Sequence, residues 1–143
     1  MKRYLVVAAL VIVPLYGLSR ATEEIVKSMV PHGEISRKIG KDYSVKTQIG
    51  TKMMVEFDRE GNLDEASGLN LGAGDIFEPG NGLITLGSAA QIIKKLGKDV
   101  KGEWHLENDP RHGWIYGLHG MKEEDNVEYI VDANKGQLIK SVE

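Results

Sequence analysis

The side chains best suited to chemistry lie close together near the C-terminal end of the chain. They are three histidines spaced by seven residues and three neighbouring carboxylates: His105, His112, His119, Glu103, Glu107 and Asp109. A zinc-type site needs several such groups to converge on one point. We expect His105 and His119 on neighbouring strands and His112 in a turn. We therefore interpret these residues as polar side chains on a solvated face and in a loop, with a small-ligand or metal-binding face as the alternative.

No catalytic residue is predicted elsewhere. Ser88 falls on a helix without a motif around it, and Asp58 and Asp132 stand where turns begin and carboxylates accept backbone hydrogen bonds. The glycine-rich run 72–75 is not followed by the helix start that a phosphate-binding loop requires. The chain has no cysteine, which excludes disulfides, thiol chemistry and a lipid-modified cysteine. We predict a protein that is not an enzyme, with no cofactor and no metal.

The N-terminal end of the chain has the pattern of a secretory signal peptide. Lys2 and Arg3 precede an apolar run over residues 4–18. Ser19 and Ala21 then supply the small residues of a cleavage site. The alternative is an uncleaved membrane anchor, but an apolar run of about 15 residues is shorter than the roughly 20 that a spanning helix needs. We expect an exported protein, located in the periplasm or outside the cell.

Cleavage after Ala21 would make the protein more acidic. The whole chain has a formal net charge of −3, and losing Lys2, Arg3 and Arg20 removes three positive charges, which leaves −6. An acidic protein is a poor candidate for binding nucleic acids or anionic lipids. We therefore expect no binding to nucleic acid and no membrane contact after cleavage.

The first half of the remaining chain predicts one short helix and two strands. Residues 22–30 favour a helix that ends before a proline. Segment 33–41 has isoleucines at helical spacing and suggests a further turn or two of helix. Alternating apolar side chains predict strands at 43–49 and 52–58.

The second half begins with the strongest helix pattern in the chain. Thr85 is placed to cap a helix that runs to Leu96, with an apolar stripe on one side and Gly97 after its end. Residues 100–106 alternate as a strand. Three further runs of β-branched and aromatic residues within 113–142 predict an antiparallel meander.

We predict an α+β fold in which a helix packs on a small antiparallel β-sheet, with two such units in tandem. Similar turns follow alternating strands at 57–63 and 131–138 and form a weak internal repeat, unless a favourable turn merely recurs by chance. The expected organisation is a signal peptide, a degenerate first half, a Gly-rich linker and a second domain: 1–21, 22–68, 69–82 and 83–143.

The second half resembles the PepSY domain family. The resemblance rests on the helix ending at Leu96, the strands after it, and the final motif Val131-Asp132-Ala133 with Gly136 and Leu138. The family's fold is a helix packed on a small antiparallel sheet, and residues 22–68 match it less well. Its members are non-catalytic domains of peptidase propeptides and of secreted or membrane-attached bacterial proteins. The resemblance implies an exported module that binds or restrains a peptidase or another envelope protein.

One face of the predicted C-terminal sheet is too apolar for a solvated surface. Its side chains alternate with the expected core and are Ile115, His119, Ile130 and Ile139, with Gly117 and Glu128. A sheet face left to water should be mostly polar. This possible partner face is therefore either covered by the N-terminal half or offered to a partner. We expect cover by the chain itself, because the first half also needs a surface to bury.

Overall fold

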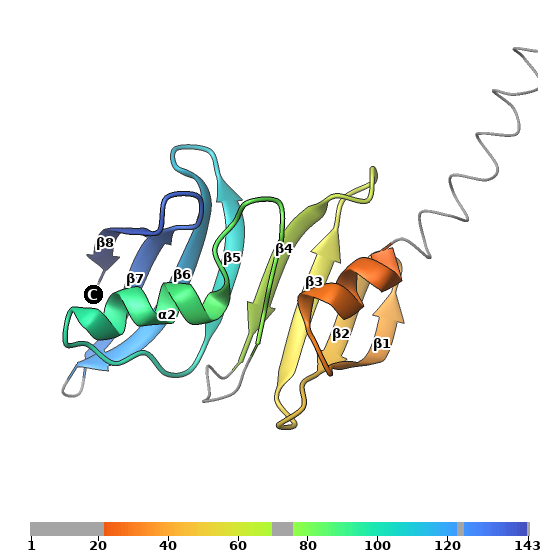
Figure 1. The fold of residues 1–143 in the computed structure, drawn as a ribbon, viewed down its shortest axis with the longest axis horizontal. Coiled ribbons are helices and arrows are strands. Elements are labelled where there is room, and N and C mark those ends of the chain that lie inside the picture. Colours follow the sequence, from red (N-terminus) through yellow and green to blue (C-terminus); the bar gives the residue numbers. More distant parts are fainter. Residues whose placement is uncertain (1–21, 70–75, 123–124, 143) are drawn as a thin grey trace, which may run out of the picture.

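A computed structural model of the 143-residue chain describes residues 22–69, 76–122 and 125–142 (Figure 1). Its eight strands form one antiparallel sheet in which each strand pairs with its neighbours in sequence. The strands are β1 (Glu34–Ile39), β2 (Asp42–Lys46), β3 (Lys52–Phe57), β4 (Leu63–Gly68), β5 (Trp104–Asp109), β6 (Gly113–Lys122), β7 (Asp125–Asp132) and β8 (Gln137–Val142). Residues 22–29 form a helical segment before β1, and helix α2 (Leu86–Lys95) precedes β5.

This architecture corrects the predicted fold class. We expected an α+β fold made of a helix on a small sheet, twice in tandem, but the described chain is mostly one eight-stranded sheet with two short helices. The two four-stranded meanders join where β4 pairs with β5, from Glu65 opposite Glu107 to Gly68 opposite Trp104. Without this pairing both strands would expose unpaired backbone N–H and C=O groups at a sheet edge, and joining the meanders satisfies both edges.

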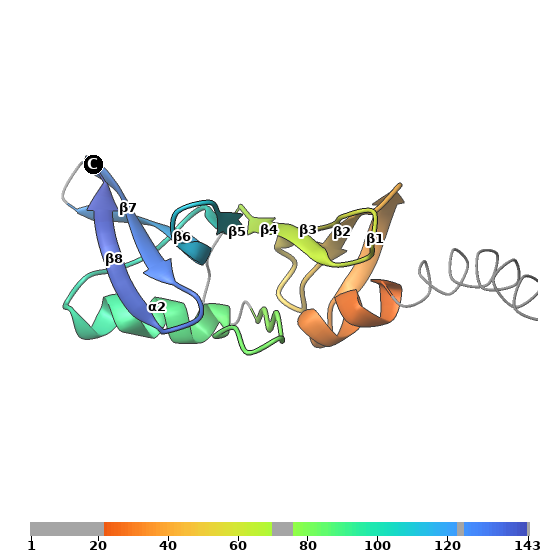
Figure 2. The same cartoon turned by 90° about the horizontal axis from the view of Figure 1, so that it is seen from above.

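Both helices lie on the same side of the sheet (Figure 2). We call this side the helix face and the other side the open face. Strand side chains on the helix face form the buried core, and they include Tyr43, Val45, Met53, Val55, Ala66, Trp104, Leu106, Tyr116, Leu118, Tyr129 and Val131. They meet the buried helix residues Val26, Met29, Leu86, Ala89 and Ile93. The core therefore runs under β2 to β7 and leaves the open face without a covering layer of helices.

Helix α2 is the best-predicted element of the chain. Thr85 is its N-cap, and its Oγ1 atom accepts a hydrogen bond of 3.1 Å from the backbone N–H of Ser88. Lys94 and Lys95 occupy the last turn, where the helix dipole stabilises positive charge. The predicted apolar stripe is confirmed except at Leu96, which is the C-cap and is 52% exposed.

Segment 33–41 was predicted as additional helix, and this prediction is wrong. Residues Glu34–Ile39 are strand β1, which pairs with β2 and has a register shift between Ile35 and Arg37. Gly40, with a φ of 59°, makes the turn between the two strands. The isoleucine spacing misled because hairpin pairing overrides a weak local periodicity.

Two residues in the described part of the predicted linker, Phe77 and Pro79, are buried. Phe77 is fully buried, and its ring centroid lies 5.2 Å from that of Trp104. Its carbonyl oxygen accepts a hydrogen bond from the N–H of Leu86, and the next N–H, that of Glu78, donates to the carbonyl of Met29. Residues 76–82 therefore connect the two helices. The glycine-rich run 72–75 and the predicted signal segment 1–21 lie outside the described residues, within which no helix is long and apolar enough to cross a membrane.

Candidate binding groove on the open face

A row of carboxylates crosses four neighbouring strands on the open face. Asp42 lies directly opposite Glu56, Glu56 opposite Glu65, and Glu65 opposite Glu107. We call these four residues the acidic row. Like charges directly opposite each other destabilise a sheet. The pKa of the Glu56 carboxyl is raised above its ordinary value, first by partial burial and then by the charges of Asp42, Glu65 and Asp64. The surroundings of Glu56 in the acidic row therefore disfavour the charged form of its carboxyl.

The neighbouring row of residues alternates small and large side chains and forms the floor of a groove. Ser44 lies opposite Met54, Met54 opposite Ser67, and Ser67 opposite His105. The row continues to Gly117 on β6, and the imidazole of His105 lies across this glycine, where a Cβ would come within 2.2 Å of its Cε1 atom. Short side chains between longer ones produce a hollow that runs across the strands.

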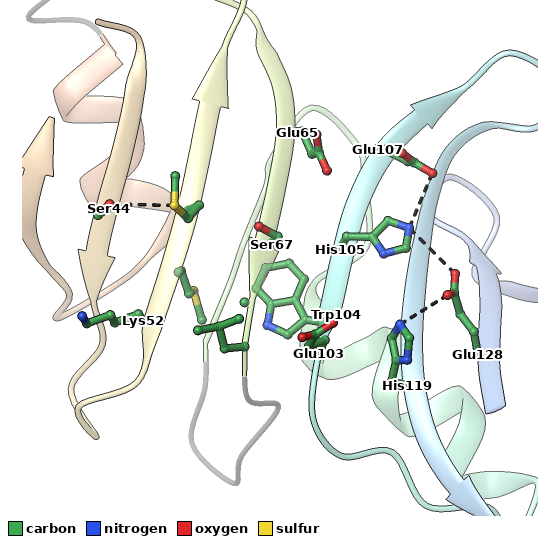
Figure 3. Close-up of a pocket in the computed structure, with 14 residues that line it drawn as sticks. Ser44, Lys52, Glu65, Ser67, Glu103, Trp104, His105, Glu107, His119 and Glu128 are labelled. Atoms are coloured by element: carbon green, nitrogen blue, oxygen red, sulfur yellow. Dashed lines mark hydrogen bonds and ion pairs between the residues drawn. The ribbon is translucent and has the colours of Figure 1, made fainter. Parts of the chain in front are cut away.

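The groove has a volume of about 660 Å³ and is lined by residues of β2 to β7 and of the segments next to β4 and β5 (Figure 3). Its charged lining residues are Lys52, Glu65, Glu103, Glu107 and Glu128. Its apolar lining residues are Met53, Met54, Leu69 and Trp104, of which Met53 and Trp104 belong to the buried core of the helix face. The groove thus combines a strongly acidic lining with an apolar part at the end of β4.

Two of the three predicted histidines lie together in this groove. His105 is on β5 and His119 on β6, as expected for neighbouring strands. The Nε2 atom of His105 lies 3.5 Å from Glu107 Oε1 and 3.9 Å from Glu128 Oε1. The Nε2 atom of His119 lies 3.3 Å from Glu128 Oε2. His112 is exposed in the turn after β5. Glu128 was not among the carboxylates grouped with the histidines, because only the pairing of β6 with β7 brings it opposite His119.

Trp104 carries a buried polar group without a partner. Its side chain is 1% exposed, and its Nε1–H has no hydrogen-bond partner among the described residues. The indole lies on the helix face over Gly68, where a Cβ would come within 2.2 Å of Nε1. Gly68 therefore leaves room for the ring in the core, and a buried donor without a partner costs about 1–3 kcal/mol.

Two residues of the predicted partner face are buried. Ile115 and Ile130 are 5% and 6% exposed, although they lie on the open face. A hollow on this face borders both and is also lined by Glu107, Arg111, His112, Glu128, Lys140 and Val142. The N-terminal half extends the sheet edgewise through β4, so the expected cover by that half is wrong. Ile139 falls at a register shift in β8 and has no partner in the register.

The geometry of the histidine cluster does not match a formed metal site. Within the part of the chain that the structure describes, no group of three or more His, Asp or Glu side chains is arranged to hold an ion. The Nε2 atoms of His105 and His119 instead approach different carboxylate oxygens of Glu128, Oε1 and Oε2 respectively. These three side chains thus form a set of polar contacts on the wall of the groove.

Comparison with known proteins gives little independent information. No family model matches the chain, and no curated protein matches it. Among solved structures, a crystal structure of a "putative lipoprotein" from Clostridium difficile 630 shares 18% sequence identity with this chain at a TM-score of 0.42. The alignment covers 90% of this chain and 91% of that chain.

Proposed function

We propose that this chain is an exported, non-catalytic binding module that holds another protein of the cell envelope against the open face of its sheet. The observation that carries the proposal is the groove of about 660 Å³ between the acidic row and the His105–Glu128–His119 cluster. Neither helix covers this face, so a partner can approach it directly. The PepSY resemblance of residues 83–143 remains a prediction, and it names a peptidase as one such partner.

Site-specific cross-linking tests whether the open face is the binding surface. Met54 is 40% exposed on the groove floor, and its replacement by a photo-cross-linking amino acid places the reactive group in the groove. Gln91, exposed on α2, is the matched position on the other side of the molecule. We expect illumination in cells to yield a discrete protein adduct from position 54 and none from position 91. Adducts from neither position, or from position 91 alone, would contradict the proposal.

Export is the second part of the proposal, and it rests on the sequence of the N-terminal segment. Cleavage after Ala21 removes residues 1–21 and leaves Thr22 as the first residue. Intact-mass analysis of the protein purified from the envelope fraction of its source measures this directly. We expect the mass of residues 22–143. A mass that includes the first segment would indicate an anchored protein, and recovery only from the cytosol would contradict export.

A metal-binding or small-ligand function of the histidine-bearing face is the second candidate. The observation in its favour is that His105 and His119 both lie within 3.9 Å of Glu128. Ligand binding stabilises a fold by RT ln(1 + [L]/Kd), which is about 2.7 kcal/mol at a hundredfold excess over Kd. A large rise in Tm with Zn²⁺ or Cu²⁺ that is lost in the double variant His105→Ala, His119→Ala would favour this candidate over the protein-binding module.

A further inference from the structure

We propose that the open face binds short free peptides with apolar side chains in a second hollow, beside the groove. This hollow has a volume of about 370 Å³ and is lined by residues of β5 to β8 and of the turn between β5 and β6. It borders Ile115 and Ile130 and shares only Glu107 and Glu128 with the groove. Its ligand is a small molecule, so this binding is separate from the binding of a protein in the groove.

The floor of the hollow is apolar although it faces away from both helices. Ile115 and Ile130 occupy diagonal positions on β6 and β7, because Asp132 lies opposite Ile115 and Gly117 opposite Ile130. Val142 adds an apolar side chain from β8. A sheet face left to water is usually polar. Two neighbouring isoleucines at the bottom of a hollow on this face are therefore suited to contact the apolar side chains of a ligand.

Charges of opposite sign stand on the two sides of this floor. Glu107 on β5 lies directly opposite Ile115, and Lys140 on β8 lies directly opposite Ile130. Across the four strands the order is therefore a carboxylate, two isoleucines and an ammonium group. Arg111, in the turn after β5, adds a second cation to the lining. A lining with this order is complementary to a molecule that has a positive end, an apolar middle and a negative end.

Both cations of the hollow are available to a ligand. Among the described residues, no carboxylate lies within ion-pair distance of the Arg111 guanidinium or the Lys140 ammonium group. The Oδ2 atom of Asp109 accepts hydrogen bonds from two backbone N–H groups of the turn that carries Arg111. His105 approaches Glu107 at Oε1, at a distance of 3.5 Å, so the ammonium group of a ligand would bind the other oxygen, Oε2.

The separation of these charges favours a peptide over a single amino acid. Three strand spacings separate β5 from β8, which is about 14 Å at roughly 4.8 Å per strand. Glu107 and Lys140 form no ion pair with each other, so a gap remains between their charged groups. The two charged groups of an amino acid are attached to the same carbon atom and cannot bridge this gap. An extended chain of two or three residues is about 7–10 Å long and can bridge it.

Nuclear magnetic resonance of isoleucine methyl groups tests the site on the protein purified after expression of the full chain. The ligand is the dipeptide leucyl-leucine with both termini free. We expect saturable shifts of the δ-methyl signals of Ile115 and Ile130, which the variants Ile115→Val and Ile130→Val identify. Ile39, exposed on β1, is the internal control and should not respond. Free leucine, which is too short, and seryl-serine, which is not apolar, should both bind more weakly than leucyl-leucine.

Modified ligands and matched variants then assign each terminus to its side chain. Leucyl-leucine that is acetylated at its N-terminus or amidated at its C-terminus should bind about twofold to fivefold more weakly, the effect of one exposed charge pair. Lys140→Gln should weaken the free dipeptide and leave the amidated form unchanged. Glu107→Gln should weaken the free dipeptide and leave the acetylated form unchanged. Lys135→Gln, exposed in the turn before β8, is the matched control and should bind normally.

Three results would overturn the inference. The first is the absence of saturable shifts at both isoleucines, or an equal response at Ile39. The second is equal affinity for the free, acetylated and amidated dipeptides, because the apolar floor alone would then bind them. The third is a variant that weakens all forms equally. The modified ligands act on the unaltered protein, so their result does not depend on how the variants fold. The cross-linking test of the proposed function is independent, because Met54 does not line this hollow.

Discussion

The hydroxyl of Tyr116 donates a hydrogen bond of 2.8 Å to the backbone carbonyl oxygen of Ile84. The bond joins the middle of β6 to the residue that precedes the cap of α2. A similar link exists in the first half, where the hydroxyls of Tyr43 and Thr22 lie 2.7 Å apart. Each helix is thus tied at its start to a buried tyrosine of the sheet, and this arrangement keeps both helices on one face and the other face free.

Replacing Tyr116 by phenylalanine should destabilise the protein without changing its core volume much. Burial raises the pKa of the Tyr116 phenol, so the group remains a neutral donor at any ordinary pH. Its loss leaves the carbonyl of Ile84 without this donor, and we expect a loss of about 1–3 kcal/mol in the free energy of unfolding. Urea denaturation measures it. Unchanged stability would mean that the bond contributes nothing and that α2 is held by apolar contacts alone.

Two glycines should respond in opposite directions to substitution by alanine. A Cβ at Gly68 would lie 2.2 Å from Nε1 of Trp104, so Gly68→Ala must displace the indole or the end of β4. We expect a loss of about 1–3 kcal/mol, as for other overpacked sites. Gly87 is exposed in α2 with nothing nearer to its Cβ position than an atom at 3.9 Å. We expect Gly87→Ala to stabilise by about 0.5–1 kcal/mol. Thermal melts followed by circular dichroism compare the two, and equal effects would contradict the packing at Gly68.

Adjacent residues of β7 test which face of the sheet is the core. Val131 is fully buried on the helix face, and Ile130 borders a hollow on the open face. Val131→Lys puts a charge into the core and should unfold the protein at room temperature. Ile130→Lys can extend its ammonium into water past Glu128 and Lys140, and we expect the protein to remain folded with a loss of about 1–2 kcal/mol. Unfolding of both variants would mean that the open face is a second core.

The acidic row predicts a particular dependence of stability on pH. The pKa of Glu56 is raised in the folded protein, so the folded state favours the protonated form relative to the unfolded state. The resulting destabilisation is absent below the unfolded pKa and develops as pH rises through the folded pKa. Glu56→Gln should therefore increase stability at pH 7, by less than about 1 kcal/mol because the group is partly solvated, and should have no such effect near pH 3. Denaturant titrations at both pH values decide this, with Glu60→Gln in the exposed turn as the control.

The local elements could largely be predicted from the sequence. The cap at Thr85, strands β2 and β3, and the C-terminal meander all follow from side-chain periodicity and turn residues. The turns at Asp58 and Asp132 are confirmed in atomic detail, since each Oδ1 atom accepts hydrogen bonds from two backbone N–H groups of its turn. These features depend on residues close together in the chain, and local patterns are therefore sufficient to find them.

The joining of the meanders and the groove could not be predicted in this way. The pairing of Glu65 with Glu107 connects segments separated by a long stretch of chain, and no alternation pattern specifies it. The acidic row depends on the register of four strands, which places one carboxylate of each strand opposite the next. The sequence of a single strand does not predict it. Phe77 was missed for a related reason, because its glycine-rich surroundings resemble a linker although its ring packs against Trp104. The register between strands that are distant in the chain cannot be predicted from local sequence patterns.

The strand order has a kinetic consequence. Every pair of neighbouring strands is also consecutive along the chain, so most sheet contacts join residues that are close in sequence. Proteins dominated by such contacts fold faster than sandwiches with long-range pairings. Only the junction of β4 with β5 requires a long closure, over residues 69–103, and the entropy cost of closing a loop grows slowly with its length. Each meander can therefore form before the two are joined. Two molecules caught at that stage can pair β4 of one with β5 of the other, so a dimer that exchanges C-terminal meanders is the expected by-product of refolding at high concentration.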